Sequence, residues 1–255
     1  MTEIITDLIK KDLPFVYVKF GDGEYNAANG YYGSNCDGDP YTDKLRNGLI
    51  EAINYYSSFN NVYCGKWHTP DVPSYFDSMV HSKDIKYNWI DYHTVIMFEN
   101  SFNNNNKLEL FKAIKDSKRK KILVGNELLE KAKYLLNIEN HILVPYRNWV
   151  EDLENVLKNI MDVINYEENP MIITCAGMGS KVLIMELHKR IKNGIFIDVG
   201  SGLDYLCTKK CSRGHTYSYD KLETYFKEIL PPNWNDPNFN IIYEKAKHNI
   251  GIHLR

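Results

Sequence analysis

The chain has 255 residues, 44% of them hydrophobic, and its 31 basic and 33 acidic residues leave a formal net charge of −2. This length suits one α/β body with a small appendage, and the near-zero charge provides no basic field for a nucleic-acid partner. No window approaches the roughly 18 apolar residues that cross a bilayer, and the start lacks the order of a signal peptide. We therefore expect a cytoplasmic protein without a transmembrane segment.

The cysteine and aromatic content indicate the cellular compartment and the kind of ligand that would suit this protein. The five cysteines are an odd number scattered along the chain, which suits a reducing compartment without disulfides. Aromatic residues make up 13% of the chain, 19 of them Tyr, and such flat side chains with polar rims suit sugars and nucleobases. An AT-rich coding sequence would enrich Tyr and Asn as well, so both explanations stay open.

The first half of the chain alternates short helices and strands. Apolar spacing predicts a helix over 3–11, and after Pro14 a β-rich run predicts a strand over 15–20. The further elements expected here are a helix over 42–57, strands over 61–65 and 93–98, and a weak helix around 73–82. The turn-rich segments 31–41 and 66–71 are predicted loops.

The second half is more regular. We expect helices over 107–117, 127–136, 149–164 and 181–192, and strands over 121–124, 142–144, 171–175 and 195–199. This alternation predicts a Rossmann-like α/β fold, with a mostly parallel sheet and helices on both faces. We expect residues 1–216 to form this domain and residues 217–255 a helical C-terminal appendage packed on the same body.

The segment from Phe20 to Glu24 reads Phe-Gly-Asp-Gly-Glu and follows a predicted strand, where open α/β sheets bind ligands. In an extended segment, Asp22 and Glu24 would point the same way with Cα atoms about 6.5–7 Å apart, and could share one cation. Oxygen ligands favour Mg²⁺ or Mn²⁺. Gly21 and Gly23 would let a diphosphate approach the backbone. The alternative is an ordinary turn, because Gly and Asp are common in turns.

Two blocks resemble one family. The run Val18–Glu24, with a basic residue before Phe-Gly-Asp-Gly-Glu, resembles the opening motif of the glycosyltransferases of the GT-D fold, formerly a domain of unknown function. The stretches Ala176–Leu183 and Ile197–Gly200 are similar to that family's later pattern: a Gly-containing turn, a helix, and a strand ending in Asp-hydrophobic-Gly. Together the blocks bracket residues 15–206 in the expected order.

The resemblance implies a nucleotide-sugar donor, in particular a UDP-sugar, and a glycan or glycoconjugate acceptor. It implies Mn²⁺ or Mg²⁺ held by Asp22 and Glu24, since a cation stabilises charge on the departing nucleoside diphosphate. The candidate donor-binding residues are Lys19, Phe20, Gly21, Gly23, Tyr25, Lys66, Gly177, Met178, Gly179, Ser180 and Ser201. For the lysines the alternative is a solvated surface position, and for the Gly177–Ser180 turn it is tight strand–helix packing rather than phosphate binding by a helix N-terminus.

The motif does not identify the general base, because Ser201 stands where the family has a His after Asp-hydrophobic-Gly. If the reaction inverts the anomeric centre, a carboxylate or an imidazole must take the acceptor proton. Asp198 and Asp204 are the nearest catalytic candidates, and His68 and His215 are looser ones. Asp198 could equally cap a helix or orient a loop.

Four further interpretations stay open. Trp67 could stack on a sugar or pack in the core, and Cys207, Cys211 and His215 superficially suggest zinc but lack a fourth ligand. The missing His motivates one alternative function, an inert nucleotide- or glycan-binding module of the same fold. The other alternative is a metal-dependent phosphohydrolase that uses the same carboxylates.

Overall fold

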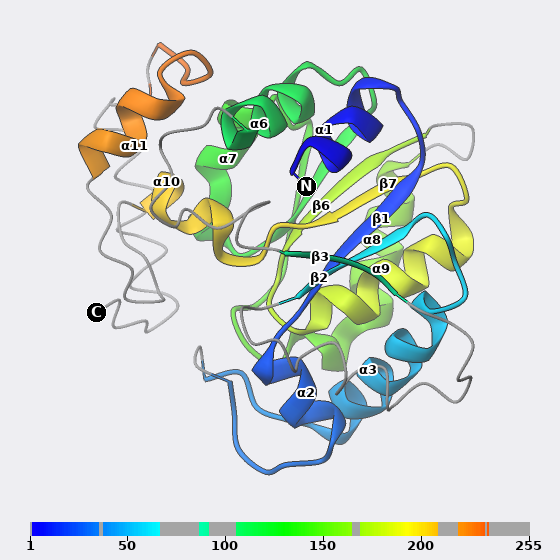
Figure 1. Ribbon diagram of the computed structural model, residues 1–255. Coiled ribbons are helices and arrows are strands. Elements are labelled where there is room, and N and C mark those ends of the chain that lie inside the picture. Colours follow the sequence, from blue (N-terminus) through cyan, green and yellow to red (C-terminus); the bar gives the residue numbers. More distant parts are fainter. Residues whose placement is uncertain are drawn as a thin grey trace.

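A computed structural model of the chain describes residues 2–35, 38–66, 87–91, 106–164, 169–208, 219–232 and 234. Its centre is a seven-stranded sheet of order β3-β2-β1-β7-β6-β4-β5, in which every pairing is parallel (Figure 1). The strands are β1 (Phe15–Phe20), β2 (Val62–Lys66), β3 (Asn88–Asp91), β4 (Lys121–Gly125), β5 (Asn140–Leu143), β6 (Met171–Cys175) and β7 (Ile195–Asp198). The predicted Rossmann-like α/β arrangement is confirmed.

Helices cover both faces of the sheet, because its central strands are apolar on both sides. One face packs on α2 (Asp22–Ala28), α3 (Asp43–Tyr56), α8 (Leu153–Val163) and α9 (Gly179–Arg190). The other packs on α1 (Thr2–Lys10), α6 (Asn106–Asp116), α7 (Glu130–Leu136), α10 (Asp204–Thr208) and α11 (Tyr219–Phe226). Short 3₁₀ turns precede α7, α8 and α10: η1 (Glu127–Leu129), η2 (Trp149–Asp152) and η3 (Gly200–Leu203).

Most predicted elements lie within a few residues of those observed. The predicted strand over 93–98 and the weak helix around 73–82 fall outside the described residues, and β3 was not predicted. Its four residues, Asn-Trp-Ile-Asp, are polar at both ends and too few to show a period. The strand exists because its backbone pairs with β2, from Tyr63–Asn88 to Lys66–Asp91.

The Phe-Gly-Asp-Gly-Glu segment differs from the extended conformation that we expected. Gly21 is the extended N-cap residue of α2, so helix begins at Asp22, directly after β1. Glu24 occupies the third helical position, and its Oε2 accepts a hydrogen bond from the Gly21 N–H at 3.0 Å. Residues two apart on a helix do not face each other, so the expected shared alignment of Asp22 and Glu24 is wrong.

The described part of the C-terminal segment packs against α6. The ring of Phe226 lies edge-on to Phe111 at 5.4 Å between centroids, and the Leu108 N–H donates to the Tyr225 hydroxyl. Phe226 and Trp234 are buried in the core on that face. The predicted boundary near 216 lies outside the described residues. Within the described ranges, no helix has the length and apolar character needed to cross a bilayer.

Candidate functional site

A polar pocket of about 260 Å³ opens at the carboxyl edge of the sheet. Its walls come from the segments that follow β1, β4, β5, β6 and β7, and the loop between α2 and α3 closes one side. Growth of the sheet reverses at β1, where β2 and β3 add on one side and β7 on the other, and such reversals create crevices in α/β folds (Figure 1). The predicted residues that line it are Lys19, Phe20, Gly21, Asp22, Gly23, Glu24, Gly177, Met178, Ser201 and Asp204.

The other predicted residues lie elsewhere. Tyr25 packs against the core, and Ser180 is fully buried, with its Oγ accepting from the Ala176 N–H. Gly179 serves packing, since a Cβ there would clash with Val150 and Trp149. His68, His215 and Trp67, and the Lys66 side chain, are outside what the structure describes, although Lys66 pairs with Phe20 as the last residue of β2.

Lys181, which lines the pocket, binds two carboxylates. Its Nζ lies 2.6 Å from Glu24 Oε1 and 2.9 Å from Asp198 Oδ2, and it also donates to the Gly177 carbonyl at 3.4 Å. The side chains of Lys181, Glu24 and Asp198 are only 3%, 12% and 0% exposed. The three protons of the ammonium therefore have three acceptors, from the segments after β1, β6 and β7. We call Lys181, Glu24 and Asp198 the buried triad.

The pKa directions of Glu24 and Lys181 both favour the charged form. Burial acts to raise the pKa of Glu24, but the Lys181 ammonium, the backbone N–H of Glu24 itself and Lys19 outweigh it, so this pKa lies below its ordinary value. Burial acts to lower the pKa of Lys181, but the charges of Asp198 and Glu24 outweigh it and raise this pKa. Neutral pH therefore leaves both groups ionised.

Asp198 is engaged on both oxygens. Oδ2 accepts from the Lys19 N–H at 3.4 Å as well as from Lys181, and Oδ1 accepts from the Gly200 N–H at 3.1 Å. Gly200 has φ +54°, and a Cβ there would meet the Lys19 side chain. Asp198 thus orients the loop after β7 and does not line the pocket. Asp204, which lines it, is the better placed of the two predicted bases.

The sequence did not single out Lys181 or Asp39. The sequence signal that could have identified Lys181 is a lysine among the apolar residues of a helix. The structure buries the positions from Gly179 to Met185. Asp39 is 6% exposed and accepts from the Asn148 N–H at 2.9 Å, which fastens the loop between α2 and α3 to the segment after β5. This bond spans 109 positions, so no local pattern could predict it.

A divalent cation held jointly by Asp22 and Glu24 does not fit this geometry. Both oxygens of Glu24 already accept from Lys181 and Gly21, and in the described part of the chain no three His, Cys, Asp or Glu side chains are grouped to hold a metal ion. The charge of the pocket nevertheless suits a cation that arrives with an anionic ligand. Lys19 and Lys181 balance Glu24 and the buried Asp198, and three further carboxylates, Asp22, Asp39 and Asp204, line the pocket.

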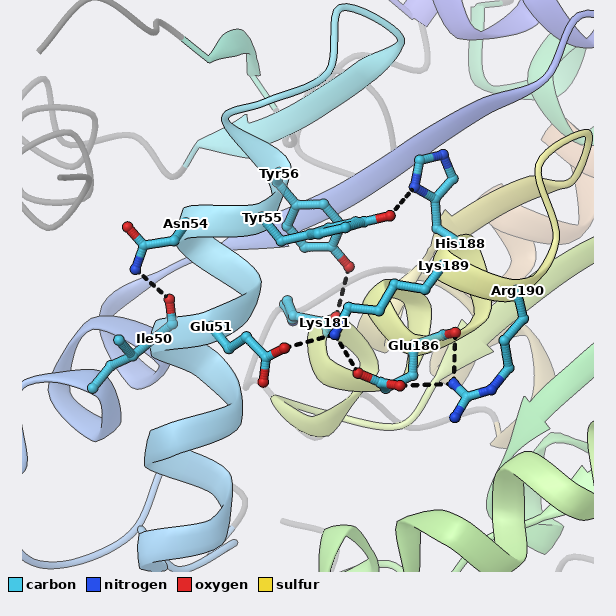
Figure 2. A network of polar contacts seen from close by, with 10 residues as sticks. All are labelled: Ile50, Glu51, Asn54, Tyr55, Tyr56, Lys181, Glu186, His188, Lys189 and Arg190. Carbon is cyan, nitrogen blue, oxygen red and sulfur yellow. Dashed lines mark hydrogen bonds and ion pairs between the residues drawn. The ribbon is translucent and has the colours of Figure 1, made fainter. Parts of the chain in front are cut away.

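The helix that carries Lys181 is anchored to α3 along its length. The Tyr56 hydroxyl donates to the Lys181 carbonyl at 2.6 Å, and at the other end of α9 the Tyr55 hydroxyl lies 2.9 Å from His188 Nδ1 (Figure 2). Tyr56 is 1% exposed, and burial, the largest cause, raises its pKa well above the ordinary value. These contacts keep the backbone under the pocket fixed.

No family model, curated protein or solved structure matches the chain.

Proposed function

We propose that this protein is a glycosyltransferase, which moves a sugar from a nucleotide-sugar donor, a UDP-sugar in the first instance, to a hydroxyl of a glycan or glycoconjugate. A divalent cation, Mn²⁺ or Mg²⁺, accompanies the donor. One observation carries the proposal: the two segments that resemble the GT-D glycosyltransferases, more than 150 positions apart, line one pocket and are in contact there through Glu24 and Lys181. If each segment resembled the family only by chance, the two segments would not be expected to line the same pocket.

The floor and walls of the pocket suit a diphosphate. Gly21, Gly23 and Gly177 line it without side chains. Gly177 has φ +62°, and a Cβ at this position would lie 3.8 Å from Asp39 Oδ2. The first turn of α9 begins beside the pocket, and its backbone N–H groups favour a nearby negative charge. Lys19 adds a cationic side chain to the lining. A bound cation would neutralise charge on the departing nucleoside diphosphate.

Two further parts of the lining have roles under this proposal. Asp204, at the start of α10, takes the proton of the acceptor hydroxyl, because Asp198 is buried and fully engaged. Tyr41 and Tyr146 also line the pocket and offer flat faces to a base or a sugar. Both tyrosines come from loops, as is common for residues that determine substrate choice.

The test is donor turnover on a panel of UDP-sugars and hydroxyl acceptors, with and without Mn²⁺, for the wild type, Asp22→Ala and Asp204→Asn. We expect metal-dependent sugar transfer by the wild type, with at least a tenfold loss in each variant. The control is Asp43→Asn, which removes a comparable exposed first-turn carboxylate from α3, outside the pocket.

Product analysis separates the alternatives. UDP binding without turnover over hours would favour an inert binding module, and phosphate release without sugar transfer would favour a phosphohydrolase. Full activity in Asp22→Ala would contradict the proposed role of the Phe-Gly-Asp-Gly-Glu segment.

A further inference from the structure

The two carboxylates of the Gly-Asp-Gly-Glu turn have different surroundings. Asp22 is exposed at the first position of α2, lines the pocket, and pairs with no side chain among the described residues. Glu24, only 12% exposed, accepts from Lys181 with one oxygen and from the Gly21 N–H with the other. A helix separates the two side chains by about 200° of rotation, at 3.6 residues per turn.

From this geometry we infer that Asp22 and Glu24 do separate work: Asp22 alone of the pair contacts the donor's divalent cation, and Glu24 is a positioning residue whose partner is the Lys181 ammonium. This inference rests on the proposed function for Asp22, but the pairing of Glu24 with Lys181 stands without it. The sequence motif suggested that both carboxylates bind one cation, because an extended segment would point them the same way. The segment is helical, so they do not point the same way.

The cost of any other arrangement supports this division. If Glu24 turned to a metal ion, Lys181 would lose one of its three acceptors while remaining 3% exposed, and the Gly21 N–H would lose its partner. Buried charged groups that lose a partner are strongly destabilising. Asp22 can bind a cation without breaking any side-chain hydrogen bond or ion pair among the residues that the structure describes.

Glu24 and Lys181 also determine where the pocket backbone lies. Through Lys181, Glu24 is joined to Asp198 at the end of β7 and to the Gly177 carbonyl after β6. The three segments that would surround a diphosphate are thus fastened to one ammonium. Loss of this ammonium would misplace the walls of the site rather than remove a metal ligand.

Two measurements on the full-length chain separate the roles. The first is calorimetric titration with Mn²⁺ in the presence of UDP, for the wild type, Asp22→Asn and Glu24→Gln. We expect Asp22→Asn to weaken Mn²⁺ binding at least tenfold and Glu24→Gln to change it less than threefold. The control, Asp43→Asn, removes an exposed first-turn carboxylate from α3 and should bind as the wild type does.

The second measurement is thermal unfolding without metal or nucleotide. We expect Glu24→Gln and Lys181→Met each to melt several degrees below the wild type, with Asp22→Asn unchanged. The melting temperature of the double variant should fall by clearly less than the sum of the two single decreases, because this variant removes both members of the pair. Lys181→Arg, which keeps the charge, should recover part of the Lys181→Met loss. If Glu24→Gln is too unstable to titrate at 25 °C, its titration and that of the wild type are repeated well below its melting temperature.

The outcomes are decisive in both directions. Equal weakening of Mn²⁺ binding by Asp22→Asn and Glu24→Gln, together with additive melting losses, would overturn the inference. A wild type that binds neither Mn²⁺ nor UDP would overturn the proposed function and the role of Asp22, whereas the melting data would still decide whether Glu24 pairs with Lys181.

Discussion

The two ends of α9 carry charged clusters of similar composition in very different surroundings. At its start, Lys181 contacts Glu24 and Asp198 with almost no solvent exposure. At its end, Lys189 lies 2.6 Å from both Glu51 and Glu186, and Figure 2 shows these side chains reaching across the surface between α3 and α9. Lys189 and Glu51 are 33% and 60% exposed.

Water makes the difference between the two clusters. Around Lys189, solvent already stabilises each charge, so the ion pairs add little to the free energy of unfolding. Around Lys181, the charges have lost their solvation and depend on each other. We therefore expect substitutions at the start of α9 to have large effects on stability and on the pocket, and those at its end to have small ones. Four predictions test this contrast.

The largest effect is expected for Lys181→Met. The variant leaves Glu24 and Asp198 as two buried carboxylates without their cation, and we expect the free energy of unfolding to fall by about 3–5 kcal/mol. Urea unfolding at pH 7 measures it, with Lys189→Met as the matched control on the same helix. A loss below about 1 kcal/mol would mean that solvent reaches the triad.

Gly179→Ala is next in size. A Cβ at this position would lie 2.5 Å from Trp149 Cζ2 and closer still to Val150, both of them buried. Overpacking of this kind costs about 2 kcal/mol, because either α9 or η2 must shift. Urea unfolding is again the measurement. Gly33→Ala serves as a control for crowding, since nothing lies within 4 Å of a Cβ there, although its φ of +122° adds strain. Unchanged stability would show that α9 can move away from η2.

The start of α9 also shows how far sequence reasoning reaches. Alternating apolar runs were enough to predict the parallel sheet, and strand ends were enough to place Gly21, Asp22 and Gly177 at one edge of it. The sequence could not reveal that Lys181 lies between Glu24 and Asp198, because those contacts span 157 and 17 positions and depend on how three loops meet. It also misjudged the backbone at Asp22, where a Gly N-cap begins a helix.

A pH effect is expected at the other end of α9. Burial and then Lys192 lower the pKa of His188 from 6.5 to about 4. Between these values the unfolded chain binds the proton and the folded chain does not, so stability falls as pH drops below 6.5. We expect His188→Asn, which has no titrating side chain there, to lose about 1–2 kcal/mol less stability than the wild type between pH 7 and pH 5. Equal losses in urea titrations would contradict this assignment.

The smallest effect is expected for Lys189→Met. The variant removes both ion pairs, to Glu51 and Glu186, but leaves those carboxylates in contact with water, and Glu186 keeps its bond to Arg190 at 2.7 Å. We expect a change of about 0.5 kcal/mol or less in the free energy of unfolding, and less still at 1 M salt, where screening weakens exposed pairs. Donor binding should be unaffected, because this cluster does not line the pocket. A loss close to that of Lys181→Met would mean that the two ends of α9 are coupled through the helix. Solvent exposure alone would then not determine how much an ion pair contributes to the free energy of unfolding.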